Sequence, residues 1–472
     1  MKNQSKTTRR EFLYTASMTV GGALAGVGLK SATALAQPPV RVRLDVATLQ
    51  LNGPELRALR AAVDALKRLP GSDPKSWRSL ANIHQDFCPH QNWFFLPWHR
   101  AYILYFEQAC REASGDPTFT LPYWDWTTSP RLPAPFWGTG NPLMDSTRRI
   151  GPNQSADPMF VGRQVLYGAN NLGGILRITD FKTFASGEAA MQRQKTNYGR
   201  LEASPHNHIH GFVGGNMSSM LSPLDPIFWL HHANIDRLWT EWERLSPGRT
   251  TSDPRWLNFS LLGFDSIRPP SQTALTVRGV LSTHILGYRY PSQPATPPPP
   301  PTLAAVSESS LFSEGNVDGQ ATPKKPLSFA IAAPRELRAQ VHDAATKPTP
   351  ADPKDKRTRL RLILEVKPPE TSLIGVRVFL RSKAAKSNTP FGDPNYVGTF
   401  TFFGQEHEGH GSGDEKNIEF SFDVTRTLRK MALAGVYRAD SDLQVSLVPV
   451  SLSDRRAAEA TVILVRFKLE AI

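Results

Sequence analysis

Hydrophobic side chains recur with helical spacing through residues 40–245 of the chain. Four stretches place apolar residues three or four positions apart, which is the period of one face of an α-helix. The four stripes are Leu56/Leu59/Val63/Leu66, Trp77/Leu80/His84/Phe87, His99/Tyr102/Ile103/Phe106/Cys110 and Ile235/Leu238/Trp239/Trp242. This pattern predicts a mainly α-helical region organised as a four-helix bundle. Two histidines, His84 and His99, lie within apolar stripes, where a solvent-seeking side chain is not expected.

Beyond residue 302 the pattern changes to short segments typical of β-strands. Five such segments, separated by turn residues, lie at 360–366, 376–380, 418–422, 443–447 and 461–465. They predict an antiparallel β-sandwich of about 150 residues. The run PSQPATPPPPPT at 291–302 predicts an extended, exposed linker before it.

The N-terminus has the features of an export signal. The segment TRREFL at 8–13 looks like a twin-arginine motif, an apolar glycine- and alanine-rich stretch follows, and the triplet ALA at 34–36 fits a cleavage site. We therefore expect export by the twin-arginine route, to the periplasm or the medium. An N-terminal membrane anchor is the alternative, but the apolar stretch is short and glycine-rich. No later segment is long and apolar enough to span a bilayer.

These patterns together predict a multidomain α+β protein. We expect a signal peptide at 1–36, a helical catalytic domain at 37–290, a proline-rich linker at 291–325 and a C-terminal β-sandwich domain at 326–472. The formal net charge of +13 is spread thinly over 472 residues, without a compact Lys/Arg cluster, so it indicates a solvated basic surface rather than a nucleic-acid site. With only two cysteines, the chain does not depend on a disulfide framework.

Histidine is concentrated in two short windows. Eight of the 12 histidines lie within 77–99 and 206–232. His206 and His210 are one helical turn apart and share a face, whereas His208 points to another side. His232 lies in a second predicted helix that can fold back against this pair.

Imidazole ligands without carboxylate or thiolate suit copper, zinc, nickel or iron. A single zinc ion needs only three or four ligands. Six imidazoles in two sets of three fit two copper ions, each with open positions. Two adjacent Cu(I) ions can each give one electron to dioxygen, which is a chemical reason for such a pair.

At these residues the chain resembles the type-3 copper family of tyrosinases, catechol oxidases and molluscan haemocyanins. The resemblance rests on His84-x3-Cys88-Pro89-His90-x8-His99-Arg100, on His206-x3-His210, and on the run DPIFWLHHANIDRLW at 225–239. It implies that one copper ion is bound by His84, His90 and His99, and the other by His206, His210 and His232. The C-terminal strands resemble, more weakly, the C-terminal domain of plant polyphenol oxidases.

The resemblance also implies roles for neighbouring residues. Fungal and molluscan members join a cysteine placed like Cys88 to the histidine two positions later by a thioether, here His90. A free thiol and a disulfide with Cys110 are the alternatives. Cys110 lies on an apolar helix face and is expected to be a small core residue.

Glu202 and Asn207 flank the first histidine of the second set. In plant members a glutamate at this place is thought to hold a water that takes the phenol proton, and the asparagine orients that water. Free phenol has a pKa near about 10, so a positioned base assists its ionisation at neutral pH. A carboxylate favoured by a helix N-terminus is the alternative for Glu202.

Four further residues are expected near the coppers or at the entrance to the site: Phe228, Gly211, Ser219 and His231. We expect Phe228 to pack beside the copper pair, and His231 to be a structural neighbour of the ligands. The small residues Gly211 and Ser219 are expected to leave room above the metals.

The resemblance implies an oxidase of small phenolic compounds that uses dioxygen as co-substrate. It hydroxylates monophenols at the ortho position, oxidises o-diphenols to o-quinones, and stays latent until the C-terminal domain is removed. A catechol oxidase without monophenol activity and a haemocyanin-like oxygen carrier are the alternatives. The sequence does not identify a copper-delivery partner.

Overall fold

The protein is described by a computed structural model. It covers residues 40–156, 172–245, 247–296, 298, 303–304, 310–332, 335–346, 359–369, 374–390, 392–403, 417–437, 442–451 and 461–472. Residues Val40–Ile472 form one unit. The predicted signal peptide and two histidines expected in a hairpin loop, His407 and His410, lie outside the described residues. Within them, no helix has the length and apolar character needed to cross a bilayer.

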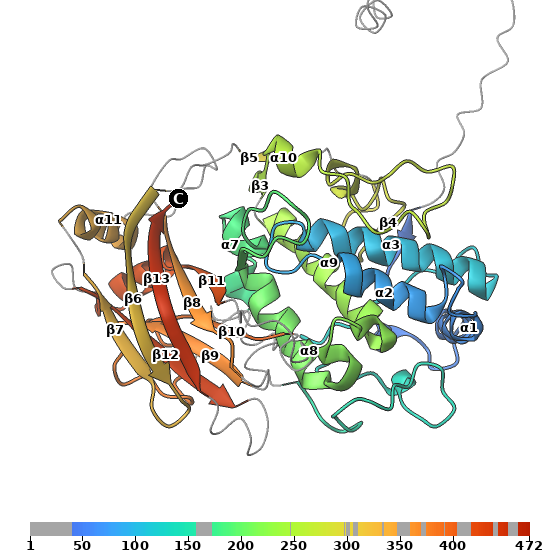
Figure 1. Cartoon of the computed structure of the whole chain (residues 1–472), viewed down its shortest axis with the longest axis horizontal. Coiled ribbons are helices and arrows are strands. Elements are labelled where there is room, and N and C mark those ends of the chain that lie inside the picture. The colour runs from blue at the N-terminus through green and yellow to red at the C-terminus, as the bar shows by residue number, and fades with distance from the viewer. Residues whose placement is uncertain are drawn as a thin grey trace, which may run out of the picture. The chain divides into compact units, whose positions relative to one another are not determined.

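Four long helices dominate residues 40–296, which we call the helical part (Figure 1). They are α1 (Pro54–Arg68), α2 (Trp77–Phe87), α3 (Phe95–Ser114) and α9 (Ile227–Leu245). Local sequence explains their ends. The side chain of Ser76 accepts a hydrogen bond from the Ser79 amide at the start of α2, and Gly115 ends α3 in the left-handed conformation at φ +69°.

Shorter elements complete the helical part. They are α6 (Leu172–Ile175), α7 (Phe181–Ala185), α8 (Asn207–Val213), α10 (Pro254–Leu257), the π-helical turn η3 (Glu202–His206), the 3-10 turns η1 (Val46–Thr48), η2 (Ala134–Phe136), η4 (Gly215–Ser218), η5 (Ser222–Leu224) and η6 (Arg278–Val280), and the short strands β1 (Arg41–Val42), β2 (Asn197–Tyr198), β3 (Thr250–Thr251) and β4 (Tyr288–Arg289). After the helical part, β5 (Leu303–Ala304) pairs with β3.

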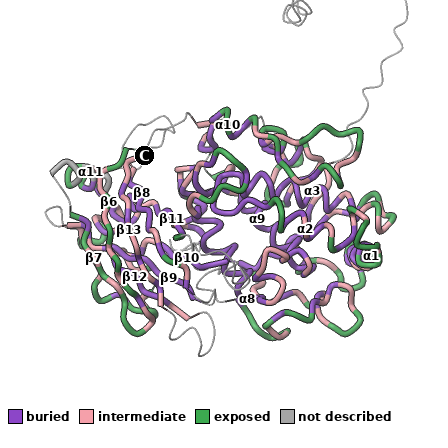
Figure 2. Tube along the Cα trace, viewed as in Figure 1, coloured by how far each residue is buried: buried purple, intermediate pink, exposed green. Residues whose placement is uncertain are grey.

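The four predicted stripes form the buried faces of the four long helices. Figure 2 shows α3 and α9 buried along most of their length, and α1 packs against α3. One stripe residue was assigned wrongly. Phe87 is 39% exposed, because α2 ends at this residue and the chain turns away from the core.

Residues 310–472, which we call the β part, contain two sheets. One has the strand order β10-β9-β12-β7 and the other has the order β2-β11-β8-β13-β6. The strands are β6 (Ser310–Ala321), β7 (Leu327–Ile331), β8 (Leu360–Lys367), β9 (Ile374–Leu380), β10 (Tyr396–Thr401), β11 (Ile418–Asp423), β12 (Leu443–Ser451) and β13 (Val462–Ala471), and the helices are α11 (Arg335–Thr346) and α12 (Thr425–Leu433). All five predicted strands are present, and both sheets share one hydrophobic cluster.

The segment expected to be a linker is partly a strand. Residues 310–321 form β6, an edge strand that pairs with β13, although the prediction placed them in the linker 291–325. The polar and glycine-rich sequence of β6 lacks a clear alternation, and its extended form depends on the partner strand. β7, β10 and the two helices of the β part were likewise not predicted.

One segment of the helical part belongs structurally to the β part. Strand β2 pairs in parallel with β11, so residues 197–198 extend the five-stranded sheet. Tyr198 and Ala203 pack in the same hydrophobic cluster as the strands of that part. The chain that leads to the histidine pair at 206 and 210 is therefore held between the two parts.

Candidate metal centre

The structure brings all six predicted ligand histidines together. His84 comes from α2, His90 from the loop after it and His99 from α3; His206 ends η3, His210 lies in α8 and His232 in α9. In each set of three, ring nitrogen atoms lie within 4.8 Å of one another. The sets are adjacent, because the rings of His99 and His232 stack with centroids 4.2 Å apart.

Five of the six imidazoles have one ring nitrogen fixed by an acceptor. The Nδ1 atoms of the first set donate to the Met220 carbonyl (His84, 2.6 Å), to Glu202 Oε1 (His90, 2.8 Å) and to the Phe95 carbonyl (His99, 2.8 Å). Those of the second set donate to Asn207 Oδ1 (His206, 2.9 Å) and to the Met217 carbonyl (His210, 2.5 Å). A carbonyl oxygen can only accept, so the proton lies on Nδ1 and Nε2 carries a free lone pair.

The free nitrogen atoms suit metal ligation. Nε2 of His84, His90, His206, His210 and His232 is buried and has no hydrogen-bond partner. Burial lowers the pKa of His84 to about 4, and burial with the neighbouring imidazoles holds the pKa of His90 well below its usual value. Neutral imidazoles with one nitrogen oriented by an acceptor and the other unpaired are the usual form of histidine metal ligands. The arrangement fits two adjacent metal ions.

His231 lies in the second cluster but differs from its neighbour. The indole Nε1–H of Trp126 donates to Nδ1 of His231 at 3.1 Å, so His231 carries its proton on Nε2. Neither ring nitrogen of His232 has a partner. Of these two adjacent histidines, His232 is thus the one prepared for ligation, and His231 packs against His206 with ring centroids 5.3 Å apart.

Glu202 is completely buried and is bound by three donors. Its carboxylate accepts from Nδ1 of His90, from the Gln91 amide at 3.0 Å and from the Ser186 hydroxyl at 2.6 Å. Burial raises the pKa of Glu202 to about 8, while the Ser186 and Gln91 donors lower it. In this structure Glu202 orients a predicted ligand. Its expected role as a base stays a prediction.

Asn207 connects the second set to the β part. Its amide oxygen accepts from His206, and its amide nitrogen donates to the Thr401 carbonyl at 3.2 Å. Both ends of this amide are therefore occupied. Its expected role in orienting a water stays a prediction.

Cys88 lies beside the first set. Its Sγ is 3.5 Å from Nε2 of His99 and belongs to the cluster that contains His90. Cys88 and Cys110 are both buried free thiols, so the alternative of a disulfide between them was wrong. Cys110 is a core residue of α3, as expected. The thioether to His90 stays a prediction.

The remaining predicted residues lie around the cluster. The ring of Phe228 is 4.2 Å from that of His232 and 5.1 Å from that of His84, centroid to centroid. Gly211 is buried in α8. Ser219 lies in a loop whose carbonyls, from Met217 and Met220, accept from His210 and His84. Sequence reasoning did not foresee that this loop orients one ligand of each set. An entrance role for Gly211 and Ser219 stays a prediction.

Sequence analysis missed Phe403, which reaches the cluster from the β part. Its ring centroid lies 5.0 Å from that of His90, 5.8 Å from His206 and 4.5 Å from His210. The side chain is 5% exposed. Phe403 follows β10 by two residues, and the sequence around this short strand contains Gly and Pro residues that hide its alternation. Only the prediction of a strand at β10 could have indicated from the sequence that Phe403 lies near the histidines.

A buried network of charges fixes the helices behind the histidines. Arg100, next to His99, pairs with Asp236 at 2.5 Å, one helical turn after His232. Arg43 lies between Glu107 at 2.9 Å and Asp236 at 3.5 Å. Buried ion pairs of this kind are costly to break by removing one partner. They join α3 and α9 directly behind the stacked rings of His99 and His232.

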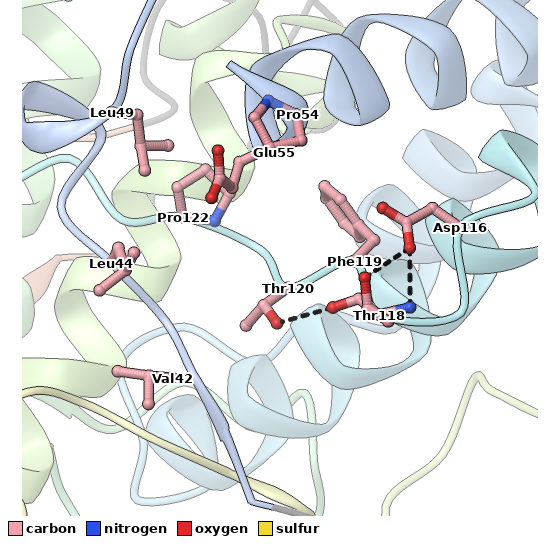
Figure 3. Close-up of a pocket in the computed structure, with 10 residues that line it drawn as sticks. All are labelled: Val42, Leu44, Leu49, Pro54, Glu55, Asp116, Thr118, Phe119, Thr120 and Pro122. Atoms are coloured by element: carbon pink, nitrogen blue, oxygen red, sulfur yellow. Dashed lines mark hydrogen bonds between the residues drawn. The ribbon is translucent and has the colours of Figure 1, made fainter.

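A separate pocket of about 180 Å³ lies near the start of α1 (Figure 3). Its lining includes Leu44, Glu55, Asp116 and Phe119, and no histidine. Asp116 is already bound by the amide and hydroxyl of Thr118. This pocket presents no converging reactive groups, so it does not compete with the histidine cluster as a functional site.

Comparisons with known proteins agree with this geometry. Residues 74–172 and 162–245 match the common central domain of tyrosinase. The chain is 28% identical over 416 residues to tyrosinase HcTyr1 of Hahella sp. (strain CCB-MM4), covering 81% of this chain and 83% of that protein. It is 25% identical over 419 residues to the chloroplastic catechol oxidase B of Solanum tuberosum, covering 80% and 68%.

Solved structures share the fold. A latent aurone synthase (polyphenol oxidase) aligns with a TM-score of 0.68 at 22% identity, over 92% of this chain and 90% of that one. A latent apple tyrosinase aligns with a TM-score of 0.67 at 20% identity, over 92% and 98%. Both alignments extend over helical and β parts alike.

Proposed function

Because this chain belongs to the type-3 copper family of tyrosinases and polyphenol oxidases, we propose that it is a copper-dependent oxidase of phenols. The observation that carries the proposal is the pair of imidazole sets, in which five of the six Nε2 atoms are buried and have no hydrogen-bond partner. His84, His90 and His99 would hold one copper ion, and His206, His210 and His232 the other. Bound copper would supply the electron transfer between phenol and dioxygen.

The residues of the chain itself orient the ligands and exclude water. The Nδ1 acceptors fix five of the six rings, so that a metal ion meets a largely prepared site instead of ordering flexible side chains. Phe228 lies against both sets and keeps the centre apolar. The charge network of Arg100 and Asp236 holds the two helices that present His99 and His232.

We propose that the enzyme hydroxylates monophenols as well as oxidising o-diphenols. Overall, a monophenol and one dioxygen molecule give an o-quinone and one water, and two o-diphenols and one dioxygen give two o-quinones and two waters. The proposal relies on Glu202 and Asn207, which flank His206. A positioned carboxylate can take the phenol proton, since the phenolate is the form that binds a metal.

A catechol oxidase without monophenol activity is the second candidate. The observation that favours it is the occupied state of Glu202, whose carboxylate already accepts three hydrogen bonds. A carboxylate committed to His90 is a weaker proton acceptor for substrate.

We further propose that the full chain is latent. Phe403 covers the imidazoles that face the β part, at 4.5 Å from His210. A phenol ring and Phe403 cannot occupy this space together. Access then requires displacement of the β part, which a cut in the proline-rich segment 291–302 would permit. Division into a catalytic domain at 37–290 and a shielding domain at 326–472 is part of this proposal, as is twin-arginine export.

Oxygen uptake by the copper-loaded chain tests these proposals. A monophenol and an o-diphenol are supplied separately, before and after limited proteolysis in 291–302. Uptake with both, rising after the cut, supports a latent tyrosinase, and uptake with the o-diphenol alone supports the catechol oxidase. Reversible oxygen binding without turnover of either would indicate a carrier and contradict the enzyme proposal.

A further inference from the structure

The loop of residues 214–220 contacts both sets of ligand histidines through its main chain. The Met217 carbonyl accepts a hydrogen bond from Nδ1 of His210. The Met220 carbonyl accepts one from Nδ1 of His84. An acceptor of this kind sets the direction of the imidazole that donates to it. A displacement of this single loop would therefore turn one ligand ring of each set.

A distant segment, residues 145–149, holds the start of the loop. Asp145 Oδ2 accepts from Asn216 Nδ2 at 2.7 Å. The Thr147 hydroxyl accepts from the main-chain amide of Asn216 at 2.8 Å and donates to Asp145 Oδ1 at 2.7 Å. Asn216 is thus bound through its side chain and its main chain by two residues that are also bound to each other. We call Asp145, Thr147 and Asn216 the clasp.

The two segments approach each other at main-chain distance. Gly214 and Gly215 have φ values of +68° and +59°, which favour glycine. A Cβ atom added at Gly215 would lie 2.1 Å from the Thr147 carbonyl oxygen, so a larger residue there would separate the segments. The Arg149 amide donates to the Val213 carbonyl at 2.9 Å, just before the loop. The position of the loop therefore depends on the segment 145–149.

The same segment also holds the chain beyond the loop. Arg148 donates twice to the Asp225 carboxylate, at 2.7 and 2.6 Å, and both side chains are buried. Asp225 Oδ1 in turn accepts from the Ile227 amide at the start of α9, the helix that carries His232. The stretch of chain that contains the two carbonyls is thus fixed at both ends.

We propose that Asp145 and Asn216 are positioning residues for both copper ions. Their hydrogen bond fixes the loop whose carbonyls orient His84 and His210, although these two histidines belong to different sets. The remaining Nδ1 acceptors orient one imidazole each, so the loss of one of them acts on one set. The loss of the clasp acts on both. This inference rests on the proposed copper-dependent function.

The copper affinity of each set can be measured separately in the full chain. His206→Ala leaves the first set complete, and His90→Ala leaves the second set complete. In each background, the metal-free protein is titrated with Cu(I) against a competing colorimetric chelator. Adding Asn216→Ala should weaken copper binding roughly 10-fold in both backgrounds. This is the lower end of the range for an outer partner, because Asn216 acts through the loop and not directly on a ring.

Asn395→Ala is the matched control for general loss of stability. Asn395 Nδ2 also makes one hydrogen bond at 2.7 Å, to the Leu380 carbonyl in the β part. Thermal unfolding of the metal-free proteins should show a similar loss of stability in the two variants. Asn395→Ala should leave copper affinity unchanged in both backgrounds. An equal fall in affinity in Asn395→Ala and Asn216→Ala would overturn the inference.

Exchange of the two residues tests the hydrogen bond itself. Asp145→Asn alone leaves an amide donor facing another donor, and Asn216→Asp alone leaves two carboxylates facing each other. Each single variant should bind copper more weakly in both backgrounds. The double variant restores a donor and an acceptor in reversed order, and the new amide oxygen at position 145 can still accept from Thr147. Copper affinity should return close to the wild-type value. A folded double variant that binds as weakly as the single variants would overturn the inference.

The outcomes separate this inference from the function on which it rests. If wild type and both backgrounds bind no copper, the proposed function itself fails. If each background binds copper, but Asn216→Ala leaves the affinity unchanged in either of them, the inference fails and the function stands. Weaker binding in both backgrounds, with recovery in the double variant, is the expected result.

Discussion

The two sets of histidines are supported in different ways. The first set is oriented entirely from within the helical part, through Met220, Glu202 and Phe95. In the second set, His206 is oriented by Asn207, whose other end is held by Thr401 of the β part, and His232 has no Nδ1 partner. The ring of Phe403 lies over both sets, with its centroid 5.0 Å from that of His90 and 4.5 Å from that of His210. The β part thus covers both sets, but only the second set has a ligand whose orienting hydrogen bond is connected to that part.

The largest effect is expected from loss of a ligand. His206→Ala should leave the second half-site with two imidazoles, and phenol oxidation should fall by more than the roughly 10–100-fold that loss of an outer partner costs. The copper content should drop from two ions to one per chain. Oxygen uptake and elemental analysis measure these effects. His284→Ala is the control, since His284 is buried against the Pro294 carbonyl away from both sets. Equal losses in the two variants would contradict the assignment.

A smaller effect is expected in the first half-site from Glu202→Gln. The change replaces the carboxylate oxygen that accepts from His90 by a neutral amide oxygen, which is a weaker acceptor, so copper binding at that set should weaken by roughly 10-fold, the lower end of the range for an outer partner. Competitive metal titration measures the affinity, and the ratio of monophenol to o-diphenol turnover shows any additional part in proton transfer. Glu188→Gln, at a surface ion pair with Lys182, is the control. Unchanged affinity in Glu202→Gln would remove the argument that Glu202 positions His90.

Phe403→Ala should make the uncut chain several-fold more active on small phenols, because the ring that covers the imidazoles is gone. The same change leaves a cavity, and loss of a buried phenylalanine costs about 3–5 kcal/mol of stability. Phe403→Leu keeps an apolar cover and should stay close to wild type. Initial rates and thermal unfolding are measured together. Activity that remains at the wild-type level in Phe403→Ala, with the protein folded, would contradict latency through this residue.

The smallest effect concerns the join between the parts. The Ser421 hydroxyl donates to Asn197 Oδ1 at 2.8 Å, beside the pairing of β11 with β2. Ser421→Ala should lower the free energy of unfolding by about 1 kcal/mol. Mild denaturant should separate the β part from the histidines and so let the uncut chain oxidise phenols, and this should occur at a lower denaturant concentration in the variant. Ser446→Ala loses a comparable bond to Ser328 within the β part. Ser446→Ala should lower the free energy of unfolding without changing the denaturant concentration at which phenol oxidation begins. An equal change in that concentration in both variants would argue against coupling between the parts at β2 and β11.

Much of the centre could be predicted from the sequence, because its signal is local. The spacing of His84, His90 and His99, and of His206 and His210, depends on helix geometry and short loops. The choice of His232 over His231 came from the family resemblance, and the hydrogen bond from Trp126 to His231 now gives it a physical reason.

What escaped prediction depends on contacts between distant segments. The carbonyls of Met217 and Met220 have no sequence signature, since any residue has a carbonyl. Phe403 reaches the histidines only because β10 is placed along η3 by tertiary contacts. β6 is extended because β13 pairs with it, not because its own pattern requires it. Of the five strands that were predicted, β8, β9, β11 and β12 are mostly buried, and this burial requires the runs of apolar residues by which they were recognised in the sequence.

The central claim is that the six imidazoles bind two adjacent copper ions. Elemental analysis of the purified full-length chain, loaded with copper and then freed of loosely bound metal, tests it most directly. The account predicts two copper ions per chain, and one in His206→Ala. A wild-type chain that retains one ion or none, under conditions where it is folded, would contradict the two-site arrangement on which the proposed chemistry depends.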